Sequence, residues 1–170
     1  LVEASPVLRA EQSSARVGHH PIWVGSVAEL PDGPLFLIAN EFFDALPIRQ
    51  FIRTEEGWAE RVIGADGGAL TFGLTVSARV DALEDRFLGS HVGDMVELGV
   101  GQTALASEIG TRIAQRGGCA LIIDYGDWGT GGDTFQAVRA HEKTSPLAAP
   151  GEADLTAHVD FAALAAALPD

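Results

Sequence analysis

Two short runs of this chain are apolar at every position. They are Leu35 to Ala39 and Ala120 to Ile123, and polar side chains follow each of them at once. Continuous apolar runs of this length are typical of strands in a parallel sheet that is covered on both faces. We therefore predict two such strands lying side by side. Open α/β sheets bind ligands outside the carboxyl ends of their strands, so the residues after each run are the first functional candidates.

The segment between these runs has a different pattern. Apolar and polar residues alternate in Ile48 to Ile52, Gly57 to Ile63 and Ala69 to Leu74, with turn-forming residues between them. This alternation indicates antiparallel strands with one exposed face, joined as hairpins. We predict an antiparallel insertion at about residues 48–94, irregular from 75 onwards, within a single partial domain that comprises residues 1–170.

Three segments have helical signals. Ser5 and Pro6 are a cap and a first helical residue for a helix that runs to about Ala15. A second helix is predicted from Gln102 to Arg116, and a third over residues 161–168 after a cap at Asp160. Together with the strands, these helices predict an α/β fold with a mainly parallel core sheet and an antiparallel insertion.

Composition limits the possible functions. The chain has 170 residues and a net charge of −13, which argues against nucleic acid as a partner and suits a cationic substrate. Its longest apolar runs fall far short of the roughly 20 residues that span a bilayer. The single cysteine, Cys119, excludes an internal disulfide, and the five histidines form no metal-binding pattern.

Acidic and amide side chains follow the first predicted strand. Asn40, Glu41 and Asp44 surround two phenylalanines, and Asp124 and Tyr125 follow the second strand. Two carboxylates near one crevice could hold a guanidinium, because its fork of N–H donors matches their oxygens. The alternative is a network that only stabilises the loop.

A second pattern competes with this interpretation. Residues 99–104, Gly-Val-Gly-Gln-Thr-Ala, match a dinucleotide-binding fingerprint and lead into a predicted helix. The segment before it, residues 94–98, is short and carries two charges, unlike a buried parallel strand. A nicotinamide-dependent oxidoreductase is an alternative hypothesis that rests on this fingerprint alone.

The motif at residues 40–47, Asn-Glu-Phe-Phe-Asp-Ala-Leu-Pro, resembles a hallmark of the MidA-like methyltransferases, the relatives of mitochondrial complex I assembly factor seven. Further segments resembling the family follow in order at 121–126, 132–141 and 151–161. The resemblance implies a Rossmann-like sheet, S-adenosyl-L-methionine as cofactor, and a protein substrate with an arginine, such as a respiratory complex I subunit. It implies a location in the bacterial cytoplasm or the mitochondrial matrix.

The same resemblance assigns roles to individual residues. It implies cofactor contacts by Glu3, Ser26, Asn40 and Glu41. It implies catalytic or substrate-orienting roles for Glu41, Asp44, Asp124, Tyr125 and His141.

The family's glycine-rich cofactor loop would precede Leu1, so the sequence is interpreted as an internal piece of a longer protein. We accordingly expect the chain alone to bind cofactor poorly and, with a sheet edge exposed, to form homo-oligomers. A non-catalytic assembly or binding module is the other alternative.

Overall fold

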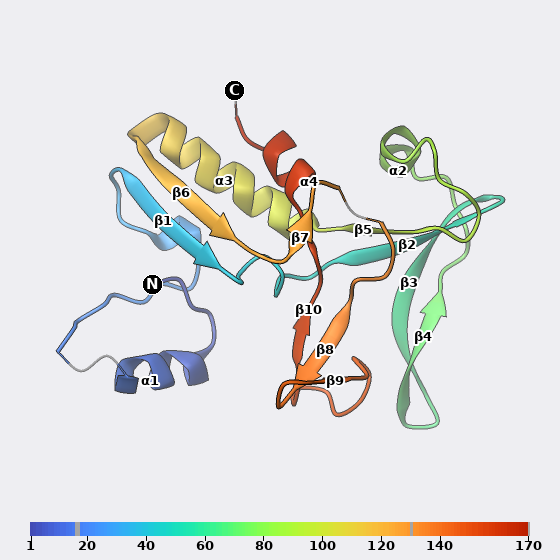
Figure 1. Cartoon of the computed structure of the whole chain (residues 1–170), viewed down its shortest axis with the longest axis horizontal. Coiled ribbons are helices and arrows are strands. Elements are labelled where there is room, and N and C mark those ends of the chain that lie inside the picture. The colour runs from blue at the N-terminus through green and yellow to red at the C-terminus, as the bar shows by residue number, and fades with distance from the viewer. Residues whose placement is uncertain (16–17, 130, 170) are drawn as a thin grey trace.

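The computed structural model describes residues 1–15, 18–129 and 131–169, and its fold is α/β (Figure 1). In chain order the elements are α1 (Pro6–Ala15), the short 3-10 helix η1 (Val27–Glu29), β1 (Leu35–Asn40), β2 (Arg49–Thr54), β3 (Gly57–Asp66), β4 (Ala69–Leu74), α2 (Asp81–Arg86), β5 (Met95–Leu98), α3 (Val100–Arg116), β6 (Gly118–Ile123), β7 (Gly126–Asp127), β8 (Gln136–Arg139), β9 (Glu142–Thr144), β10 (Asp154–Thr156), β11 (Val159–Asp160) and α4 (Phe161–Ala166).

The two apolar runs form the parallel pair β1 and β6, as predicted. Leu35 lies opposite Gly118 at one end, and Asn40 lies opposite Ile123 at the other. Figure 1 shows the two strands side by side and pointing the same way, with α3 alongside them. The loops that follow Asn40 and Ile123 therefore begin at the same end of the sheet, the carboxyl end of both strands.

The prediction that both faces of these strands are buried was wrong. Ala39 packs with Ala106 and Ile109 of α3 in the main core. On the other face, Phe36 is 78% and Ile38 75% exposed. Both faces of the strands carry apolar residues, so the run is continuous in the sequence. Within the described part of the chain, α3 covers only one of these two faces.

The antiparallel sheet predicted between the two apolar runs is confirmed, with strand order β4-β3-β2-β5. It includes β5, which lies just beyond the segment at about 48–94 for which we predicted it. Its last strand, β5, pairs antiparallel with β2, so it is not a parallel strand of the β1–β6 pair. The dinucleotide fingerprint at residues 99–104 requires a parallel strand before its helix, and the structure does not provide one. This result removes the structural basis for a nicotinamide-dependent oxidoreductase.

One face of the insertion has its own core. Phe51, Trp58 and Val96 pack there against Leu83 of α2, and Leu83 is fully buried. Helix α2 lies where we predicted irregular structure, and that prediction was wrong. The helix has only six residues, too few for a clear helical period, and it is stabilised by packing on the sheet.

The remaining elements agree closely with the sequence signals. The three predicted helices are α1, α3 and α4, and the Asp160 carboxylate accepts a hydrogen bond of 2.9 Å from the Ala163 amide. Val2 and Val24 form one isolated parallel bridge. The C-terminal part adds a sheet of order β10-β8-β9 and the parallel pair β11-β7. Among the described residues, no helix is both long and apolar enough to span a membrane.

Candidate active site

The loop between β1 and β2 is anchored by a carboxylate from the neighbouring strand. Asp124 follows β6, and its Oδ2 accepts hydrogen bonds from the amides of Phe42 (3.1 Å), Phe43 (2.8 Å) and Asp44 (3.4 Å). Its Oδ1 accepts a further bond of 3.0 Å from the Tyr125 amide. Successive amides around one anion form a concave binding site, so Asp124 sets the path of the loop. This geometry matches the loop-stabilising alternative for Asp124.

Two other segments fix the same loop. Gln102 of α3 is buried, and its Nε2 donates to the Phe43 carbonyl at 2.8 Å. The Ala157 amide donates to the Asp44 carbonyl at 3.0 Å. The Phe43 ring is fully buried in the main core. The position of the Asp44 side chain is therefore determined by β6, α3 and the segment before β11 together.

The Asp44 side chain is a buried carboxylate. It is only 5% exposed. Burial raises its pKa to about 6, and the negative charges of Asp124, Asp154 and Glu41 add to the effect. A hydrogen bond from the Ala45 amide opposes the shift without cancelling it. No Lys, Arg or His forms a salt bridge with Asp44 among the residues that the structure describes.

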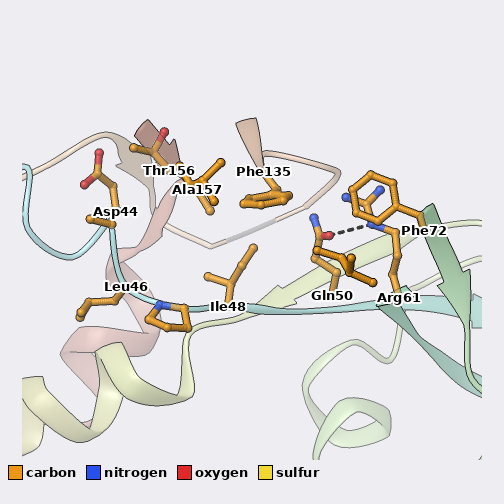
Figure 2. A pocket seen from close by; sticks show the side chains of 13 residues that line it. Asp44, Leu46, Ile48, Gln50, Arg61, Phe72, Phe135, Thr156 and Ala157 are labelled. Carbon is orange, nitrogen blue, oxygen red and sulfur yellow. Dashed lines mark hydrogen bonds between the residues drawn. The ribbon is translucent and has the colours of Figure 1, made fainter. Parts of the chain in front are cut away.

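Asp44 lies at one end of a cavity of about 310 Å³. Figure 2 shows Asp44 at that end and Arg61 with Phe72 at the other, with Ile48 and Phe135 between them. The lining residues come from the β1–β2 loop, the insertion, and the segments around β8 and β10; they are Asp44, Ala45, Leu46, Pro47, Ile48, Gln50, Arg61, Ile63, Phe72, Phe135, Leu155, Thr156 and Ala157.

The positive charge at the far end of the cavity is already paired. Arg61 donates from Nη1 and Nη2 to the two carboxylate oxygens of Asp133, at 2.6 and 2.8 Å, and stacks on Phe72. These bonds hold the pKa of Asp133 below its usual range. Arg61 also donates from Nε to Gln50 at 2.8 Å. Among the described residues, the cavity therefore has one paired cation, Arg61, and one carboxylate, Asp44, that forms no salt bridge, which suits a cationic ligand.

Several predicted residues lie around this loop. Glu41 directly follows β1 with a positive φ of 46°, and its amide donates to the Ile123 carbonyl at 2.8 Å. Asn40 ends β1 beside a second cavity of about 400 Å³, which runs along the unpaired edge of that strand. Tyr125 is exposed after β6. The structure thus brings one group of predicted residues together at the carboxyl end of the parallel pair: Asn40, Glu41, Asp44, Asp124 and Tyr125.

The other predicted residues are engaged elsewhere. The Glu3 carboxylate accepts from the Ser5 amide at 2.8 Å and from Gln12 at 3.1 Å. The Ser26 hydroxyl donates to Glu29 at 3.0 Å. His141 lies in the exposed turn between β8 and β9. Figure 1 shows this turn at the end of the β8–β9 hairpin that is away from the loops after β1 and β6. The structure therefore does not bring His141 into the cluster.

Sequence reasoning missed the residues that shape the cavity. Gln50, Arg61 and Phe72 belong to the insertion, which we had interpreted only as half-exposed sheet. Gln102 is a polar residue on a predicted helix, where solvent exposure is the ordinary expectation. The sequence signal for the insertion side of the cavity was the alternation of its strands, which places residues 50, 61, 63 and 72 on one face.

The fold and the site define an α/β protein with a buried carboxylate in a mainly apolar cavity, next to the loop that follows the parallel strand β1. The chain belongs to the family described as "Putative S-adenosyl-L-methionine-dependent methyltransferase", which it matches over residues 1–170. Within the described residues, no group of three or more His, Cys, Asp or Glu is arranged to hold a metal ion.

Related proteins and solved structures agree with this family. The chain is 38% identical to "Protein arginine methyltransferase NDUFAF7, mitochondrial" from Danio rerio, over 96% of the chain and 44% of that protein. It is 39% identical to the Homo sapiens protein of the same name, over 84% of the chain and 32% of that protein. A crystal structure from Burkholderia thailandensis with bound S-adenosyl-homocysteine matches 98% of this chain and 46% of its own, with a TM-score of 0.79 and 26% identity. The chain thus spans less than half the length of these proteins.

Proposed function

We propose that this chain forms the substrate-binding part of an S-adenosyl-L-methionine-dependent protein-arginine methyltransferase. The observation that carries the proposal is Asp44, a buried carboxylate that forms no salt bridge among the described residues and lines a cavity next to the loop after β1. An arginine side chain supplies both the missing charge and a fork of N–H donors for such a carboxylate. The relatives named as protein arginine methyltransferases support this choice of substrate.

The role of the residues is positional. S-adenosyl-L-methionine, when bound, supplies the methyl group. Transfer then depends on holding the acceptor nitrogen in line and within about 3.5 Å of the methyl carbon. Ionised Asp44 would hold the guanidinium, while Asp124 keeps the loop in place through three backbone amides. Glu41 adds negative charge at the same edge.

The residues at the end of β1 fit the cofactor in part. The cavity of about 400 Å³ beside this strand has mainly apolar walls, and Asn40 is among its lining residues. Such a lining suits an adenosine, which is flat and apolar on its faces and polar at its edges. Asn40 would therefore contact the cofactor. Glu3 could contribute only by exchanging its bonds to Ser5 and Gln12 for bonds to a ribose.

The resemblance to complex I assembly factor seven extends the proposal to an arginine on a respiratory complex I subunit. Relatives named as mitochondrial support a mitochondrial location, for which we propose the matrix. The bacterial source of the similar Burkholderia structure supports a bacterial protein, for which we propose the cytoplasm. A non-catalytic binding module is a second candidate. The internal hydrogen bonds of Glu3 and Ser26 favour it, because they occupy two groups expected to hold the cofactor.

Two measurements test the proposal. The full-length gene product is incubated with an arginine-containing peptide and S-adenosyl-L-methionine carrying a labelled methyl group, and mass spectrometry locates the label. We expect the label on a guanidino nitrogen, with loss of transfer in Asp44→Asn and normal transfer in Asp66→Asn, a variant of an exposed residue at the end of β3. Isothermal titration with S-adenosyl-homocysteine and NADH is the second measurement. Binding of neither compound to the full-length product would favour the binding module.

A further inference from the structure

The insertion has one covered face and one that is only half covered. Phe51, Trp58 and Val96 occupy the face that packs on α2. The strand register places Gln50 opposite Arg61, and Ile63 opposite Phe72, on the other face. Near β2, that face is covered by the segment carrying Asp133, through the bonds from Gln50 and Arg61.

The outer half of the same face is apolar and open. Ile63 and Phe72 lie there as a cross-strand pair, and Phe72 is 41% exposed. Across the cavity stand Phe135 and Leu155, and Leu155 is 42% exposed. These four side chains, here called the apolar groove, continue the cavity that holds Asp44 at its inner end.

We propose that the apolar groove binds the residues that flank the substrate arginine, so that the enzyme prefers an arginine with a large apolar neighbour in an extended protein segment. This inference rests on the proposed function. Asp44 takes the guanidinium, and the neighbouring apolar side chain lies between Phe72 of the insertion and Leu155 of the opposite wall. The insertion thereby determines which arginines are accepted.

Charge and size support this occupant. Arg61 is paired with Asp133, so the cavity presents no free cation to an anionic ligand. The net charge of −13 favours the approach of a basic segment. A volume of about 310 Å³ lies at the small end of the range for ligand pockets, which suits one or two side chains.

The test compares kcat/KM of the full-length gene product for two peptides. One carries leucine on both sides of a single arginine, and the other carries serine at these positions. We expect the leucine peptide to be preferred by about tenfold, since burial of one apolar side chain in a binding site has an effect of this order. In Phe72→Thr, the ratio of kcat/KM for the leucine peptide to that for the serine peptide should fall towards one. The matched control is Val62→Thr, a change on the opposite face of the same hairpin, which should leave the preference intact.

The possible outcomes distinguish a failure of the groove proposal from a failure of the proposed function. If neither peptide is methylated, the proposed function fails and the groove proposal fails with it. If both are methylated with equal kcat/KM, the function stands and the groove proposal is overturned. A dimer of the full-length product that dissociates on Phe72→Thr would also overturn it, because the groove would then be a contact between copies. Leu155→Thr, on the other wall, replaces Phe72→Thr if that variant does not fold.

Discussion

Replacing Asp44 by asparagine should stabilise the chain at neutral pH. The asparagine keeps the size of the side chain and can still accept the hydrogen bond from the Ala45 amide, but it removes a buried negative charge. The pKa of Asp44 rises from 3.8 to about 6 in the folded chain. One pKa unit corresponds to about 1.4 kcal/mol, so ionised Asp44 destabilises the folded state by no more than about 3 kcal/mol.

The sign of the effect fixes its pH dependence. Below pH 3.8 the Asp44 carboxyl is protonated in both states, and the substitution should change the free energy of unfolding little. Between pH 3.8 and about 6 the unfolded chain releases its proton first, so the folded state of the wild type loses stability as pH rises. Above about pH 6 the penalty is complete. The stability gain of Asp44→Asn should therefore grow between pH 4 and 6 and then stay constant.

Urea denaturation at pH 4, 5, 6 and 7.5 measures this gain as the difference between the variant and the wild type. Asp66→Asn is the control, because Asp66 is exposed at the end of β3 and should give no gain that grows over this range. The reasoning is refuted if Asp44→Asn is no more stable than the wild type at pH 7.5, or if its gain is the same at pH 4 and 7.5. Loss of methyl transfer together with higher stability would show that the buried charge is kept for binding.

Four further predictions address other parts of the molecule. In the full-length product, kcat/KM should rise as pH passes through about 6, where Asp44 ionises, and a flat profile between pH 5 and 7 would contradict its role. Asp124→Ala should lower the free energy of unfolding by about 2–3 kcal/mol, because it leaves three backbone amides without their acceptor, and urea denaturation measures the loss. Gly126→Ala should destabilise the chain in thermal melts, because a Cβ at this position would lie 2.1 Å from the Val159 carbonyl oxygen. The isolated chain should self-associate in sedimentation experiments through the open side of β1, and Ile38→Lys should reduce this association; a monomeric wild type would contradict the prediction.

Local patterns were enough to predict most elements of the fold. The apolar runs gave β1 and β6, and alternation gave β2 to β4, because side-chain periodicity is set by the strand itself. Caps and terminating residues gave α1, α3 and α4 almost to the residue. Helix α2 was not predictable, since packing of Leu83 on the insertion, rather than any local period, stabilises it.

The site was predictable only as a region. The motif after β1 located the acidic loop, but Glu41, Asp44 and Asp124 are chemically alike in the sequence. Their roles differ because the tertiary structure directs three backbone amides to Asp124 and buries Asp44 in a cavity without a counter-ion. The sequence by itself determined most of the strands and helices, and it located the polar loops that follow β1 and β6. Burial, charge pairing and the meeting of distant segments around Asp44 were decided by the tertiary structure, because these properties depend on contacts between residues far apart in the chain.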